Sequence, residues 1–279
     1  MLNWQIIFCV WLVFTTAASL LYRRFAVKSE LDPLTSGVIR ATTVSLPAML
    51  AIVILTGDFY IPAYSVLAIS CIESIIGTAY GYVSFYAIKE TDTSTFTTLV
   101  KLSVVPLIIL SGIFLGEGLS SSQMLGAGLL LLSSLVLGKV KMSRRGVGLM
   151  LLSIILITLI GLLSRYLVEA TNVVTTLTLS FGFGLVFKLI PSYKNLYTQK
   201  EQIKKELPMI IGLGLVAFPQ ILLLMWATDL ADNLSLLSAL ASAKVVTVAI
   251  AAAIFLKERD NIKIKLLAAL LAMVGSMLI

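Results

Sequence analysis

The sequence contains no histidine and only two cysteines among its 279 residues. The missing histidine removes the commonest metal ligand and the commonest general base from any candidate site. Cys9 and Cys71 both lie in apolar runs, which indicates buried free thiols rather than a disulfide framework or a metal site. We therefore expect no metal, no cofactor and no catalytic residue in this chain.

Charged residues are also scarce, because they make up 13% of the chain while hydrophobic residues make up 59%. A soluble domain of this length needs much more polar surface. The apolar runs are roughly 17–25 residues long, the length that crosses a bilayer core about 30 Å thick. Because they are continuously apolar rather than alternating, they favour helices over barrel strands. The sequence therefore predicts an all-α integral membrane protein whose first partner is the lipid bilayer.

Ten segments have the length and apolarity of a transmembrane helix. They are residues 3–22, 34–56, 63–87, 94–115, 121–138, 146–168, 171–189, 207–227, 234–256 and 264–279. Of the 21 Lys and Arg residues, 17 fall in the odd-numbered connections, Lys188 being counted among them. Basic loops stay on the cytoplasmic side, so both termini are expected outside. Short connections and no targeting segment favour a multi-pass protein of the plasma membrane, and the net charge of +7 is attributed to these loops rather than to nucleic-acid binding.

Two short patterns recur about half a chain apart. Phe-Leu-x-Glu occupies residues 114–117 and again 255–258, and Leu-Leu-x-Arg occupies residues 20–23 and again 162–165. A repeat unit of five helices must lie in opposite orientations in its two copies, because five is odd. We therefore predict two inverted five-helix repeats, residues 1–140 and 146–279, an architecture that secondary transporters use. Chance similarity between apolar segments is the alternative.

The Phe-Leu-Gly-Glu of residues 114–117 and the Phe-Leu-Lys-Glu-Arg of residues 255–259 each close a helix that precedes a last helix rich in small residues. In these stretches, in length and in five-plus-five organisation, the sequence resembles the EamA-type members of the drug/metabolite transporter superfamily. The resemblance covers nearly the whole chain and implies a helical transporter with a central cavity and alternating access. It also implies that helix-borne lysines bind an anionic moiety, as in the triose-phosphate and nucleotide-sugar branches.

Ionisable residues inside the apolar segments are the candidate substrate-binding residues, because such residues are costly in a membrane unless they are paired or face water. Lys101 and Lys244 lie near the middle of the fourth and ninth segments, at nearly corresponding positions of the two repeats. We expect them on opposite walls of one cavity, where two ammonium groups favour a carboxylate or a phosphate. The structural alternative is one lysine in an ion pair and the other extended to a membrane surface.

Glu73, near the middle of the third segment, is the expected ion-pair partner of one of these lysines or the carrier of a coupling proton. Tyr80 follows on the same helical face and is expected to line the cavity with it. Arg40 is expected to extend to the membrane surface. The Gly-x-x-x-Gly pair at 77–81 is expected to pack against another helix. Residues 192–207 are predicted to be a connector with a short amphipathic surface helix.

These features predict a secondary transporter for a small anionic or zwitterionic metabolite, such as an amino acid, an organic acid or a phosphorylated compound. ATP hydrolysis is not expected, because no Gly-x-x-x-x-Gly-Lys-Ser/Thr sequence occurs. One alternative is an intramembrane enzyme, against which stand the missing histidine and the missing His-Glu-x-x-His motif. Another is a non-transporting scaffold subunit, which gains nothing from costly buried charges.

Overall fold

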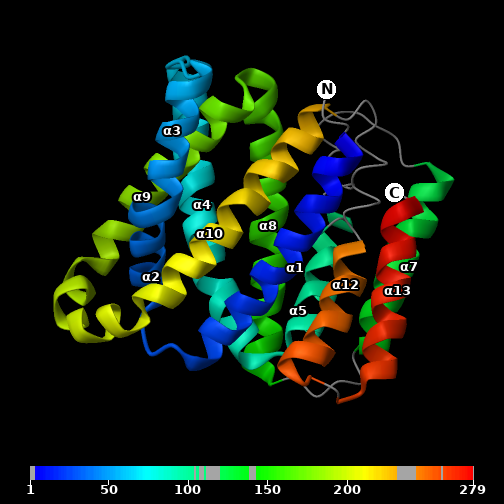
Figure 1. Cartoon of the computed structure of the whole chain (residues 1–279). Helices are drawn as coiled ribbons and strands as arrows, with labels where there is room; N and C mark the ends of the chain where they lie inside the picture. Colours follow the sequence, from blue (N-terminus) through cyan, green and yellow to red (C-terminus); the bar gives the residue numbers. More distant parts are fainter. Residues whose placement is uncertain are drawn as a thin grey trace.

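The computed structural model describes residues 4–103, 105–106, 110, 120–137, 143–230, 243–258 and 260–278. Every regular element in these ranges is helical (Figure 1). In chain order the elements are α1 (Trp4–Lys28), α2 (Pro33–Arg40), η1 (Ala41–Ser45), α3 (Leu46–Thr56), α4 (Tyr64–Glu90), α5 (Thr93–Val100), η2 (Lys101–Ser103), α7 (Ser121–Leu137), α8 (Arg144–Ala170), α9 (Val173–Thr198), α10 (Lys200–Leu230), α12 (Ala243–Ala251), η3 (Ala252–Leu256) and α13 (Ile262–Leu278).

Six helical stretches within the described ranges are long and apolar enough to cross a membrane. They are Ile6–Lys28, Pro33–Thr56, Tyr64–Glu90, Arg144–Ala170, Val173–Thr198 and Lys200–Trp226. The predicted all-helical membrane class is therefore confirmed. The count of ten crossings and the inverted repeat remain predictions. Parts of the fourth and ninth predicted segments lie outside the described residues, as does the Phe-Leu-Gly-Glu stretch at 114–117.

Large apolar side chains cover much of the outside of the helices. Ile54 is 80% exposed, Leu55 is 83% exposed and Leu135 is 71% exposed. In water, extended apolar surface of this kind is unfavourable and uncommon in monomeric proteins. In a bilayer, the same side chains lie among lipid chains, so the exterior agrees with a membrane environment.

Several helices begin where the sequence offers a side-chain cap. Asp32 accepts a hydrogen bond from the Thr35 amide at 2.9 Å, and Pro33 follows it at the first helical position. Ser143 and Asn172 accept hydrogen bonds from backbone amides in the first turns of α8 and α9. These caps satisfy amides that have no partner within the helix. They explain why α2, α8 and α9 start where they do.

The predicted second segment is a single helical stretch with a π-helical turn in its middle. At the end of η1 the Leu46 amide bonds to the Ala41 carbonyl, five residues back. Pro47 follows directly and cannot donate to the carbonyl of Thr43, so a regular α-helical ladder is interrupted at this point. Arg40 is the last residue before the π turn. The interruption therefore adjoins a half-buried cationic side chain.

The structure corrects the predicted end of the seventh segment. α9 continues past Leu189 and through Pro191 to Thr198, and α10 begins at Lys200. The predicted connector of residues 192–207 therefore consists of the ends of two long helices that meet at Gln199. Polarity suggested a connector, but Lys, Glu and Gln are good helix formers and extend both helices. Lys188 consequently lies inside α9 and not in a connection.

The helices pack in pairs that are distant in sequence. α1 packs on α10, α4 on α8 and α9, α2 on α9, and α7 on α13 (Figure 1). The α7–α13 pair is close because Gly275 has no side chain: a Cβ there would lie 2.8 Å from the Gly126 carbonyl oxygen. The predicted packing role of the 77–81 glycine pair is wrong, since a Cβ at Gly77 or Gly81 would meet nothing within 4 Å.

At the end of the bundle where α1 finishes, side chains from α13 and the turn before it hold the start of α5. Glu258 accepts hydrogen bonds from the Thr93 amide at 3.1 Å and the Thr93 hydroxyl at 3.2 Å. Arg23 of α1 forms an ion pair with Glu258 at 3.4 Å. Lys265, which is only 1% exposed, donates to Asp92 at 2.7 Å. The first and second halves of the chain are thus tied together at this end.

Candidate functional site

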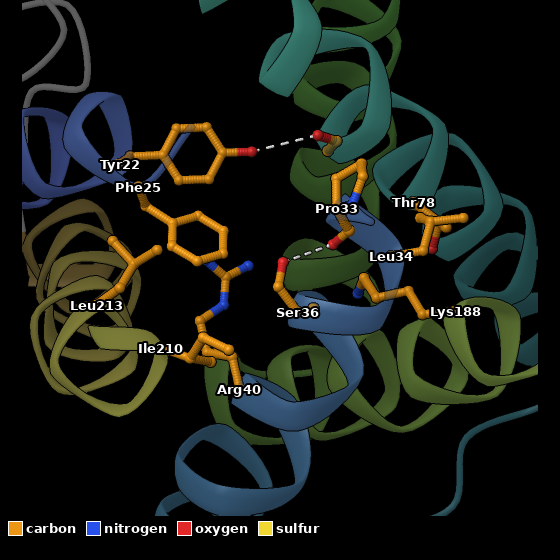
Figure 2. A pocket seen from close by; sticks show the side chains of 12 residues that line it. Tyr22, Phe25, Pro33, Leu34, Ser36, Arg40, Thr78, Lys188, Ile210 and Leu213 are labelled. Carbon is orange, nitrogen blue, oxygen red and sulfur yellow. Dashed lines mark hydrogen bonds between the residues drawn. The ribbon is translucent and has the colours of Figure 1, made fainter. Parts of the chain in front are cut away.

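A small cavity lies between α1, α2, α4, α9 and α10, and we call it the α2–α9 pocket (Figure 2). Its volume is about 30 Å³. A cavity of this size holds about two water molecules. Its lining residues are Tyr22, Phe25, Pro33, Leu34, Ser36, Gly37, Arg40, Thr78, Gly81, Lys188, Ile210 and Leu213.

Arg40 enters the pocket from α2, contrary to the expectation that it extends to the membrane surface (Figure 2). The aliphatic part of the Arg40 side chain passes over α10 at Gly214. A Cβ at Gly214 would lie 3.0 Å from the Arg40 Cγ and 2.9 Å from a methyl group of Val44. The close approach of α2 to α10 therefore directs the Arg40 guanidinium into the pocket. Its position on α2, considered without α10, would also have allowed the side chain to reach the membrane surface.

Lys188 enters the same pocket from α9, and its side chain lies against two glycines. A Cβ at Gly37 of α2 would lie 3.1 Å from the Lys188 Cδ, and a Cβ at Gly184 would lie 3.2 Å from its Nζ. The positive charge of Arg40 and the negative charge of Glu73 both act on the Lys188 ammonium. The pocket therefore brings together two cations from different helices.

Several polar groups of the pocket have no partner in the part of the chain that the structure describes. Among the described residues, neither Arg40 nor Lys188 forms a hydrogen bond, and no carboxylate oxygen lies within 4 Å of their nitrogen atoms. The Thr78 hydroxyl is buried and likewise lacks a hydrogen-bond partner. Arg40 and Lys188 are half-buried, and unpaired polar groups away from bulk water are uncommon, so these three side chains are candidates for ligand binding.

Two tyrosines lie near the pocket. The Tyr22 hydroxyl donates to the Gly81 carbonyl at 3.3 Å and lies within electrostatic range of Arg40 (Figure 2). Tyr80, predicted to bind substrate, is half-buried on α4 and lies within electrostatic range of Tyr22. Tyr80 is therefore adjacent to a residue of the pocket but is not one of its lining residues.

Glu73 is 8% exposed and its carboxylate is held by two serines. Ser164 of α8 donates to one oxygen at 3.2 Å, and Ser180 of α9 donates to the other at 3.0 Å. Its nearest electrostatic partner is Lys188, and no ion pair joins it to another described residue. The prediction that Glu73 pairs with Lys101 or Lys244 is wrong, because α4 faces α8 and α9 at this depth.

Lys101 and Lys244 lie on neighbouring elements, η2 and α12, and both are half-buried. Each lies within electrostatic range of the other: the charge of Lys244 acts on the Lys101 ammonium. Neither side chain has a hydrogen bond or an ion pair in the part of the chain that the structure describes. Residues 107–109 and 231–242, which flank them in sequence, lie outside the described residues.

The sequence predicted that Lys101 and Lys244 lie near each other, as the structure shows, and it singled out Glu73, but it missed the second cationic pair. Lys188 was assigned to a connection, although Phe187, Leu189 and Ile190 around it are apolar and indicated a helix interior. Arg40 was assigned to the membrane surface because the sequence of its own helix does not show which residues of a neighbouring helix lie against it. In the described residues, no group of three or more His, Cys, Asp or Glu side chains could hold a metal ion.

Comparison with known proteins gives a match for the first half of the chain. Residues 3–138 match the model of the EamA-like transporter family. No curated protein matches the sequence. A protein crystal structure matches the fold with a TM-score of 0.64, over 98% of this chain and 95% of the other, at 14% identity. At that identity the likeness shows a shared fold and nothing about a transported solute.

Proposed function

This chain belongs to the EamA-like transporter family, and hence to the drug/metabolite transporter superfamily. From this premise we propose that it is a secondary carrier for a small anionic or zwitterionic metabolite. Membership makes it a membrane transporter that contacts the lipid bilayer and a small-molecule substrate. The anionic or zwitterionic character of the substrate, the alternating-access mechanism and the residues that bind the substrate are our proposal.

Lys101 and Lys244 carry this proposal. They come from the two halves of the chain, their charges act on each other, and no described carboxylate neutralises either. Two like charges inside a membrane protein are unfavourable until an anion joins them. A carboxylate or a phosphate on the substrate supplies that anion. We also propose Glu73 and Tyr80 of α4 as substrate-binding residues, with Glu73 acting on Lys188 rather than on Lys101 or Lys244.

Helix packing supports a two-repeat organisation over residues 1–140 and 146–279. α1 packs on α10, while its counterpart α8 packs on α4, the counterpart of α10. α2 packs on α9 and α7 packs on α13, so each of these elements contacts its own counterpart. A pseudo-twofold axis produces reciprocal pairs of this kind. In the proposed mechanism the two repeats rock against each other around the substrate.

We further place the protein in the plasma membrane with its basic connections in the cytoplasm and both termini outside, on the distribution of Lys and Arg. A proton is the proposed coupling ion, and Glu73 is its proposed carrier. Among the described residues, the buried Glu73 carboxylate is bonded to neutral serines, so it can lose or gain a proton without breaking an ion pair.

Uptake into proteoliposomes tests the proposal. The purified chain is reconstituted and screened with labelled amino acids, organic acids and phosphorylated metabolites. Lys101→Ala and Lys244→Ala should each reduce uptake of the transported solute at least about 10-fold, the loss expected for a charge-assisted contact of about 1.5–3 kcal/mol. Lys263→Ala, which changes an exposed lysine, should transport normally.

Full uptake in both Lys101→Ala and Lys244→Ala would show that the substrate binds elsewhere. Wild-type protein that moves none of these solutes, but chemically converts one, would favour the intramembrane enzyme. Protein that neither moves nor converts any solute, alone or with a co-purifying subunit, would favour the scaffold.

A further inference from the structure

The α2–α9 pocket contains a second pair of cationic side chains that the proposed carrier site does not use. Arg40 and Lys188 come from α2 and α9, whereas Lys101 and Lys244 belong to η2 and α12. Figure 2 shows both cations pointing into one space between their helices. The two cation pairs therefore lie on different elements, although Glu73 acts on Lys188, and the charge of the α2–α9 pocket needs its own explanation.

The charges around this pocket do not cancel. Arg40 and Lys188 contribute two formal positive charges, and Glu73 is the carboxylate that acts on Lys188. Glu73 already accepts hydrogen bonds from two serines and forms no close ion pair with Lys188 within the described ranges. The cluster keeps a net formal charge of +1, which is costly inside a membrane protein unless an anion or water compensates it.

The free hydrogen-bond donors of the pocket match the needs of an oxyanion. The guanidinium of Arg40 presents a planar fork that binds a carboxylate or a phosphate through two parallel hydrogen bonds. The Lys188 ammonium adds donors from the facing helix. The Thr78 hydroxyl, which is buried without a partner, adds one donor from α4. Donors from three helices therefore surround one small space.

Both cationic side chains are held before any ligand arrives. The Arg40 stem lies on Gly214, and the Lys188 stem lies on Gly37. Contacts of this kind restrict the rotamers of long side chains, and a site whose groups are already ordered loses less entropy on binding. The arrangement is therefore a built site rather than two long side chains that happen to meet.

The size of the pocket limits what it can hold. With about 30 Å³ of free volume it accommodates a small group but not a whole metabolite. We propose that Arg40 and Lys188 form a second anion-binding site, which holds a single carboxylate or phosphate group. That group is either a dissolved anion or part of a phospholipid headgroup.

Ligand-induced thermal stabilisation tests this site independently of transport. The purified full chain in neutral detergent is titrated with inorganic phosphate, acetate or short-chain phosphatidylglycerol at constant ionic strength, and the unfolding midpoint is measured. At least one of these anions should raise the midpoint. Arg40→Gln and Lys188→Gln should each weaken that anion's apparent affinity at least about 10-fold. Lys194→Gln, an exposed change on the same helix as Lys188, should not.

The double variant Lys101→Ala, Lys244→Ala separates this site from the proposed carrier site. Stabilisation that survives in the double variant and disappears in Arg40→Gln and Lys188→Gln supports the second site, whether or not transport is ever observed. The opposite pattern overturns it, as does the absence of any stabilisation of the wild-type protein. If phosphatidylglycerol alone stabilises, through Arg40 and Lys188, the site holds a lipid headgroup; if phosphate or acetate does, it holds a dissolved anion.

A labelling experiment keeps both cations in place, so it does not depend on the folding of their variants. Cys9 and Cys71 are the free cysteines of the described chain, and both are changed to serine before Thr78→Cys is introduced. The anion that stabilises the wild-type protein should slow oxidation of the new thiol by hydrogen peroxide, a reagent small enough for this pocket, several-fold; labelling of the remaining thiol in denaturant measures the rate. An unchanged rate at saturating anion would contradict the proposed location.

Discussion

At the scale of single residues, the two pocket cations depend on glycines of the helices they cross. Gly214 of α10 lies under Arg40 and Val44, and Gly37 of α2 lies under Lys188. A Cβ at either position would have to displace a neighbouring side chain. The position of each cation is therefore set by a residue on another helix.

Gly214→Ala should destabilise the protein relative to Gly212→Ala. A Cβ at position 214 meets Val44 at 2.9 Å, and the β-branched Val44 cannot easily turn away, while a Cβ at position 212 meets nothing within 4 Å. Both changes gain the same helix propensity, so the difference reports crowding, expected at about 1–3 kcal/mol. Thermal unfolding in detergent measures it. Equal unfolding midpoints for the two variants would mean that Arg40 and Val44 are not in close contact with α10 at Gly214.

At the scale of elements, the start of α5 depends on side chains from the other half of the chain. Glu258 binds the Thr93 amide and hydroxyl, and Lys265 binds Asp92, the residue before the helix. Negative charge beside the exposed amides of a helix N-terminus is favourable. The element that leads to Lys101 is thus held at its first turn by residues close to α13.

Asp92→Asn should cost more stability than Lys265→Met. The Lys265 side chain is 2% exposed and that of Asp92 is 33% exposed, so removing the carboxylate leaves a buried, uncompensated ammonium. We expect about 3–5 kcal/mol for Asp92→Asn, and less for Lys265→Met, which replaces the cation with an apolar side chain of similar length. Lys263→Met, at an exposed position, is the control. Denaturant unfolding gives the order, and a larger loss for Lys265→Met would contradict this account.

At the scale of the whole molecule, the chain has two distinct ends. α1 begins and α13 finishes toward one end, while the turn between α9 and α10 lies at the other (Figure 1). α1 ends at Lys28 and α13 begins with Ile262 and Lys263 toward this second end (Figure 1), and exposed apolar side chains cover the helices between. These features are consistent with the proposed orientation in a plasma membrane.

Cysteine labelling in cells tests that orientation. In the Cys9→Ser, Cys71→Ser background, Asp58→Cys should react with a membrane-impermeant maleimide in intact cells. Lys200→Cys should react only after the membrane is permeabilised, because it belongs to the basic end. Both positions are exposed, so accessibility within the protein is matched. The reverse pattern would place the basic connections outside and turn the molecule over.

The helical membrane class could be predicted from the sequence because it follows from local properties. A run of apolar residues long enough to cross a bilayer must satisfy its backbone within itself, so apolarity and length suffice to predict a helix. Each of the ten predicted segments overlaps a helix in the described residues. The end of α9 was placed too early because a polar, charged stretch is compatible with both a connector and a helix.

The candidate sites show the limit of this reasoning. Helical periodicity assigns a residue to a face of its own helix but does not say which helix that face meets. Lys188 and Arg40 share a pocket because α2 packs against α9 and α10, and Glu73 lies with Ser164 and Ser180 because α4 packs against α8 and α9. Those contacts join residues that are over 90 positions apart. Local properties decided which segments became helices, and only packing between distant helices decided which charges meet.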